Sequence, residues 1–124
     1  MQNWIAYCLV FATVALTVAG QFLLKWQVLR AGALPEGTVE KLQFLGKLLL
    51  NPWVLSAFAA AFLASITWML AMTRLQLSHA YPMTALTFVI VVIGSAFVFH
   101  EAITLWKLLG LALIVIGIFV GSQG

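Results

Sequence analysis

The sequence predicts an all-α membrane protein, with four transmembrane helices in one small bundle that pairs into a dimer. Two features of the composition lead to this fold class. Of the 124 residues, 65% are hydrophobic and only 7% are charged, whereas soluble domains average about 25% charged residues. The apolar residues also come in long runs, as helices that face lipid require. A water-exposed surface cannot be built from this composition, so residues 1–124 are interpreted as a single transmembrane domain.

Four apolar runs have the length of membrane-spanning helices. The predicted spans cover residues 4–24, 53–72, 80–99 and 103–120. The first has no Lys or Arg ahead of it and is too long for a signal peptide, so we expect it to be retained. No Lys, Arg, Asp, Glu or His lies near the middle of any span, where each charge would cost about 2.5–3.5 kcal/mol.

The connections between the runs differ in length. Residues 73–79 and 100–102 are short, so the spans they join must be antiparallel neighbours. The connection at 25–51 is longer, and its second half, 36–50, alternates apolar and charged residues at helical spacing. Two interpretations of this half stay open. It is either an amphipathic helix lying on the membrane surface or a cytosolic extension of the second span.

The basic residues predict the orientation of the chain. The formal net charge is +3, and five of the cations lie on one side of the membrane: Lys25, Arg30, Lys41, Lys47 and Lys107. Arg74 is alone on the other side. The positive-inside rule then places the first and third connections in the cytoplasm and both chain ends outside. Because no basic stripe with interleaved aromatic residues is present, we expect contact with anionic membrane lipid and no nucleic-acid partner.

A row of polar residues in the first span is the strongest functional pattern. Thr13, Thr17, Gln21 and Lys25 recur at intervals of four and so lie on one helix face. Polar groups in a membrane helix face protein or a water-filled cavity, because lipid cannot satisfy them. The row ends in a cation, which could guide an anionic head group. The alternative is helix-to-helix packing with Lys25 snorkelling to the interface.

Further candidate residues flank the third span. Tyr81 and Thr84, with Thr87 as an additional candidate, could line the same cavity near the helix N-terminus. His100 and Glu101 follow the span on the predicted cytoplasmic side. Glu101 could hold a substrate amine or a structural Lys. The alternative is that this short charged loop is simply solvated.

Small residues predict where helices associate. In the fourth span Gly110, Gly117 and Gly121 are candidates for a dimer interface, the last two at G-xxx-G spacing. The second span offers a row of small side chains at intervals of four: Ala57, Ala61 and Ser65. Packing within one chain is the alternative for both sets.

Four helices with short loops enclose little volume, so a transport path is expected to need a second subunit. The sequence contains no nucleophile–base pair, phosphate loop or metal-ligand spacing, so we predict no enzyme activity, cofactor or metal site.

Together these motifs resemble the drug/metabolite transporter superfamily over nearly the whole chain. Residues 18–25, VAGQFLLK, with AYPM at 80–83 and His100-Glu101, are similar to the small EamA-like subunits of the 4-amino-4-deoxy-L-arabinose-phosphoundecaprenol flippase. Residues 110–118, GLALIVIGI, resemble the fourth-helix dimer motif of the small multidrug resistance family.

The chain departs from the small multidrug resistance family at the positions that carry drug transport there. By the alignment of residues 20–25, the proton-coupling carboxylate of that family falls on Thr17, and its cation-stacking Trp falls on Thr84. The glycines that bend its third helix fall on Leu86 and Phe88. Without the carboxylate, both the proton carrier and the counter-ion for cationic drugs are missing.

The resemblance implies a flippase subunit of a bacterial inner membrane that translocates a polyprenyl-phosphate-linked aminosugar. The partner would be a second copy or a paralogous four-helix subunit. Lys25 would attract the phosphate, Gln21 and Thr17 would hydrogen-bond the sugar, and Tyr81 and Thr84 would line the opposite wall. Two alternatives stay open: an exporter of small cations or solutes, and a non-transporting assembly subunit of a larger membrane enzyme.

Overall fold

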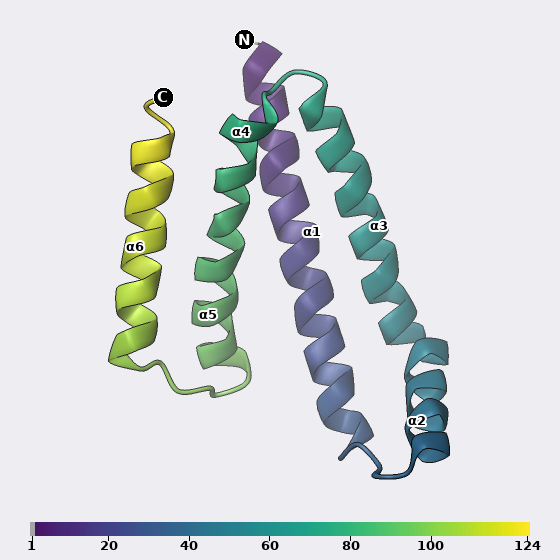
Figure 1. Ribbon diagram of the computed structural model, residues 1–124. Helices are drawn as coiled ribbons and strands as arrows, with labels where there is room; N and C mark the ends of the chain where they lie inside the picture. Colours follow the sequence, from purple (N-terminus) through teal and green to yellow (C-terminus); the bar gives the residue numbers. More distant parts are fainter. Residues whose placement is uncertain (1) are drawn as a thin grey trace.

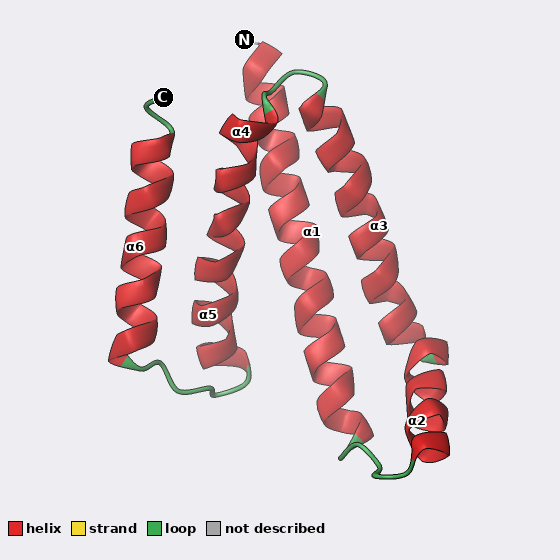
Figure 2. Ribbon diagram, viewed as in Figure 1, coloured by secondary structure: helices red, strands yellow, loops and turns green. Residues whose placement is uncertain are grey.

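The computed structural model describes residues 2–124, with side chains from Trp4 onward, and every regular element in that range is helical (Figures 1 and 2). The elements are α1 (Gln2–Ala31), α2 (Thr38–Leu50), α3 (Pro52–Met72), α4 (Leu77–Ala80), the 3-10 helix η1 (Tyr81–Ala85), α5 (Leu86–Val98) and α6 (Leu105–Gly121). The prediction of an all-α chain is confirmed.

Three stretches are long and apolar enough to cross a membrane: Trp4–Ala31, Pro52–Met72 and Leu77–Val98. The chain is therefore a multi-pass membrane protein. The apolar α6 has 17 residues, which is about 26 Å at 1.5 Å per residue, against a hydrocarbon core about 30 Å thick. A fourth crossing by α6 and a dimeric state stay predictions.

The long helices lie side by side in the order α6, α5, α1, α3 (Figure 1). The tightest pair is α1 with α3, and the side chains buried between them are small: Ala6, Val10, Val14, Val18, Val54, Ala57, Ala64 and Ala71. Small side chains let two backbones approach closely, which is how helices associate without a hydrophobic driving force. The α5–α6 hairpin packs on the other side of α1 mainly through α5, and Glu101 in the α5–α6 connection adds an ion pair with Lys25.

Two glycines mark the closest approaches. A Cβ on Gly20 would lie 3.2 Å from the carbonyl oxygen of Ala57 in α3. A Cβ on Gly94 in α5 would overlap the ring of Phe22 in α1. Gly20 therefore allows the backbones of α1 and α3 to approach closely, whereas Gly94 leaves room for the Phe22 ring between α1 and α5.

The first helix does not end where its apolar run ends. It continues past Lys25 to Ala31, because Gln27 on the next turn is buried and its Oε1 accepts a hydrogen bond from Asn51 Nδ2 at 3.0 Å. Gly32 follows with φ +90°, a left-handed conformation that commonly terminates helices. The drop in hydropathy at Lys25 marks the end of the apolar run, but the helix continues beyond it.

The segment predicted as 36–50 is the separate helix α2, which does not continue α3. Asn51 between them is extended, with φ −68° and ψ 129°. Its Oδ1 accepts from the N–H of Trp53 at 2.8 Å and caps α3, which begins at Pro52. A location of α2 on the membrane surface stays a prediction.

The third apolar run is not one regular helix. It begins as α4, tightens into η1 over Tyr81–Ala85, and continues as α5. Pro82 has no N–H to donate to the preceding turn, so the α-helical ladder is interrupted there. The interruption sets the position of Tyr81 and Thr84.

Candidate functional site

A groove runs along one face of α1, between that helix, α3 and η1. It has a volume of about 470 Å³. Its lining residues define what we call the α1–α3 groove: Thr13, Leu16, Thr17, Gly20, Gln21, Leu24, Ala57, Phe58, Ala61, Ala64, Ser65, Trp68, Tyr81 and Thr84. Tyr81 and Phe58 are 63% and 46% exposed, so the groove opens at the surface of the chain.

Five of the residues singled out in the sequence meet in this groove: Thr13, Thr17, Gln21, Tyr81 and Thr84. Three of the four residues of the row on α1, Thr13, Thr17 and Gln21, thus face a shared cavity. The additional candidate Thr87 is not among the lining residues, and neither are Lys25, His100 and Glu101. That a substrate binds at these positions stays a prediction.

The hydroxyls at the Thr13 end are already committed to helix packing. Thr13 is buried, its Oγ1 donates to the carbonyl of Leu9 at 2.9 Å, and it lies 2.6 Å from Oγ1 of Thr67 on α3. Thr17 Oγ1 donates to the carbonyl of Thr13 at 2.7 Å. The hydroxyl oxygens of these two residues can still accept hydrogen bonds, but their hydroxyl protons are already donated within the helices.

The side-chain amide of Gln21 has its full hydrogen-bonding capacity available to a molecule in the groove. Its side chain is exposed and forms no hydrogen bond within residues 4–124. An amide offers two donors and an acceptor with two lone pairs. Gln21 is therefore the best placed of the row to exchange hydrogen bonds with a polar head group.

The far end of the groove is aromatic. The rings of Trp68 on α3 and Tyr81 on η1 meet edge to face, with centroids 6.0 Å apart. Beyond them the hydroxyl of Tyr7 lies 2.8 Å from Nε2 of His79 and ties α1 to α4. Sequence reasoning missed Trp68, and interpreted Ala57, Ala61 and Ser65 only as packing residues, although they line the groove.

An ion pair lies just beyond the Leu24 end of the groove. Nζ of Lys25 is 3.6 Å from Oε1 of Glu101, and both side chains are about half exposed. The α5–α6 connection reaches α1 because His100 adopts a left-handed φ of 56° and the N–H of Glu101 donates to the carbonyl of Ser95 at 3.3 Å. The structure thus brings together the cation and the carboxylate that the sequence proposed separately.

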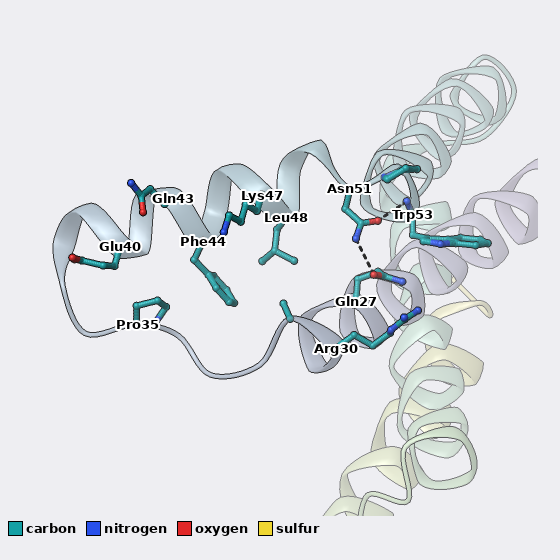
Figure 3. A pocket seen from close by; sticks show the side chains of 12 residues that line it. Gln27, Arg30, Pro35, Glu40, Gln43, Phe44, Lys47, Leu48, Asn51 and Trp53 are labelled. Carbon is teal, nitrogen blue, oxygen red and sulfur yellow. Dashed lines mark hydrogen bonds between the residues drawn. The ribbon is translucent and has the colours of Figure 1, made fainter.

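A second hollow lies where α1, α2 and α3 meet, and sequence reasoning did not predict it. This junction pocket has a volume of about 730 Å³. It is lined by Gln27, Arg30, Ala31, Pro35, Glu40, Gln43, Phe44, Lys47, Leu48, Asn51, Pro52 and Trp53 (Figure 3). The amphipathic pattern at 36–50 indicates a helix, but the pattern does not say that this helix folds back over the end of α1.

The glycines predicted as a dimer interface are not used inside the chain. A Cβ on Gly110, Gly117 or Gly121 would meet no atom of the described residues within 4 Å. The surrounding face of α6 is apolar and exposed, with Leu113 70% and Trp106 81% accessible. This face is therefore free for another chain, and its role as an interface stays a prediction.

Comparison with known proteins finds relatives that share one name. The "Probable 4-amino-4-deoxy-L-arabinose-phosphoundecaprenol flippase subunit ArnE" of Aeromonas hydrophila is 34% identical over 102 residues, which cover 82% of this chain and 83% of that protein. A protein of the same name from Pseudomonas aeruginosa is 34% identical over 115 residues, 89% of this chain and 90% of its own length. Another, from Pseudomonas savastanoi, is 33% identical over 104 residues, 84% and 85% of the two chains. No protein-family model matches the chain, and no solved structure does.

Proposed function

The chain belongs to the family of ArnE flippase subunits, and from this premise we propose that it carries the head group of a polyprenyl-phosphate-linked aminosugar across a bacterial inner membrane. The observation that carries the proposal is the α1–α3 groove, where Gln21 presents a free amide between the Lys25–Glu101 ion pair and the Trp68–Tyr81 aromatic end.

A polar groove is the physical requirement for this reaction. Moving a sugar phosphate through hydrocarbon without hydrogen-bond partners is prohibitive, because each polar group would lose its contacts with water. The groove supplies partners at Thr17, Gln21 and Thr84 along the path. Since the groove is open at the surface, the polyprenyl tail can stay in the bilayer while only the head group moves.

The ion pair beside the groove matches both charges of the substrate. A phosphate arriving at the Leu24 end meets the ammonium of Lys25 and displaces Glu101 from it. The released carboxylate is then the partner of the sugar's amine. The exchange is easy because a half-exposed ion pair contributes only about 0–1 kcal/mol.

The second subunit completes the path. In a single chain the helices form an open row, and Tyr81 and Phe58 leave one side of the groove uncovered. A second copy or a paralogous four-helix chain covers that side, with the free face of α6 as the contact. The positive-inside rule puts α2 and the α5–α6 connection in the cytoplasm, so loading occurs from the cytoplasmic leaflet.

Reconstitution tests this function. The chain and its partner are placed in proteoliposomes with a fluorescent polyprenyl-phosphate aminosugar, and flipping is followed by loss of accessibility to an external quencher. We expect Lys25→Ala to abolish flipping and Lys25→Arg to retain part of it, whereas Lys41→Ala, on α2 outside the groove, behaves as wild type. Full flipping by Lys25→Ala would rule out the assignment.

The same vesicles distinguish a drug exporter. Among the groove residues of the described chain none is acidic, so a counter-ion for a cationic drug is missing. We therefore expect no proton-driven, saturable uptake of a water-soluble organic cation, and such uptake would favour the exporter instead.

A further inference from the structure

The junction pocket has a polar base that leaves one donor unused. Gln27 is only 4% exposed, and its Oε1 accepts from Asn51 Nδ2 at 3.0 Å (Figure 3). Asn51 Oδ1 in turn accepts from the N–H of Trp53 at 2.8 Å. This chain of bonds fixes the orientation of the Gln27 amide, and its buried Nε2 has no partner in the part of the chain described. Buried donors in proteins are nearly always paired, so this donor at the base of a pocket calls for a polar partner that the described chain does not supply.

The charges at the pocket favour an anion. Arg30 and Lys47 line it from opposite sides, and Figure 3 shows Lys47 extending from α2 beside Phe44. Glu40 also lines the pocket, but its carboxylate folds over Gly37 at the start of α2, where it interacts favourably with the helix N-terminus. The guanidinium of Arg30 stacks 5.3 Å from the ring centroid of Trp26, an arrangement that leaves its N–H edges available for phosphate.

The rest of the lining is apolar, which indicates a lipid. Pro35, Phe44, Leu48 and Trp53 lie among the polar residues of the pocket. The outer face of α2 is also apolar and exposed, with Leu42, Leu45 and Leu49 on it, as expected of a helix in the head-group region of a membrane. A soluble anion would need no such apolar surroundings.

From these observations we infer that the junction pocket binds the head group of an anionic phospholipid from the surrounding leaflet. Lys47 and Arg30 hold the phosphate, and Phe44 and Leu48 contact the glycerol and upper acyl chain. The site is distinct from the α1–α3 groove, which shares none of its lining residues. A bound lipid would hold α2 against the ends of α1 and α3.

Binding of lipid to the purified protein tests the inference without measuring transport. Native mass spectrometry gives the apparent Kd of the first phosphatidylglycerol, compared with phosphatidylcholine. A cation at an anionic lipid surface contributes about 1 kcal/mol, so we expect Lys47→Gln and Arg30→Gln each to weaken phosphatidylglycerol binding about fivefold, and the double variant about 25-fold. Both side chains are exposed, so the fold should survive, and circular dichroism checks it.

Lys41→Gln is the matched control, because it makes the same charge change on α2 but does not line the pocket. We expect it to leave the apparent Kd within twofold of wild type. An equal loss in Lys41→Gln, an unchanged Kd in the double variant, or equal binding of phosphatidylcholine would overturn the inference. Competition experiments show which phosphate compound the pocket prefers. If millimolar inorganic phosphate, or the polyprenyl-phosphate aminosugar at equal concentration, displaces phosphatidylglycerol, the assignment to a resident phospholipid would also be overturned.

Discussion

Nζ of Lys25 in α1 lies 3.6 Å from Oε1 of Glu101 in the connection between α5 and α6. This pair joins the α1–α3 unit to the α5–α6 hairpin at the end of the groove where a head group is proposed to enter. Because both side chains are half exposed, water and salt weaken the attraction between them. A phosphate can therefore replace the carboxylate at low cost.

Glu101→Gln should separate the two roles proposed for this carboxylate. Removing the charge frees Lys25, so we expect binding of plain polyprenyl phosphate to tighten by up to about fivefold. Binding of the aminosugar form should not tighten, because the partner of the amine is lost. Calorimetric titration with the two lipids measures the difference, with Glu36→Gln as the control. Identical shifts for both lipids would contradict the pairing of Glu101 with the amine.

Thr13→Val should affect stability more than transport. Its hydroxyl is buried against Thr67, and hydrogen bonds between membrane helices contribute about 0.6 kcal/mol on average. We expect a loss of about that size in the free energy of unfolding, measured by detergent titration, while the correctly folded fraction still flips substrate. A stable variant without transport would instead make Thr13 a substrate ligand.

Gly20→Val should separate α1 from α3. A Cβ at Gly20 already approaches the Ala57 carbonyl to 3.2 Å, and inserting extra carbons into a packed contact costs about 1–3 kcal/mol. Gly46→Ala is the control, since a Cβ there meets nothing within 4 Å of the described chain, and it should stabilise α2 by up to about 1 kcal/mol. Thermal unfolding in detergent compares the two, and equal melting temperatures would show that the close approach is unimportant.

Gly117→Leu should weaken subunit association while leaving the single chain intact. Nothing of the described chain lies within 4 Å of a Cβ at Gly117, so the larger side chain fits in the monomer but blocks close contact with another helix. Energy transfer between labelled subunits in vesicles should fall, whereas Gly46→Leu should leave it unchanged. Undiminished transfer in Gly117→Leu would move the interface away from α6.

The sequence predicted several residues that line the α1–α3 groove, but it did not predict the end of α1 or the junction pocket. The spacing of four in Thr13, Thr17 and Gln21 places them on one helix face whatever the tertiary structure, and the Pro82 turn brings Tyr81 to the same cavity. The continuation of α1 beyond Lys25 depends instead on the contact of Gln27 with Asn51, 24 residues away. Such long-range bonds leave no periodic pattern, and for the same reason the junction pocket could not be foreseen.

Flipping by Gln21→Leu tests the central claim most directly, namely that the head group passes along the α1–α3 groove. The substitution keeps the size of the side chain and removes the one amide in the groove whose hydrogen bonds are all free. We predict that the initial rate of flipping in proteoliposomes falls about tenfold, as loss of about 1.4 kcal/mol of hydrogen bonding implies. Thr87→Val, which lies outside the groove, should stay within twofold of wild type. A wild-type rate in Gln21→Leu, at equal amounts of inserted protein, would contradict the account.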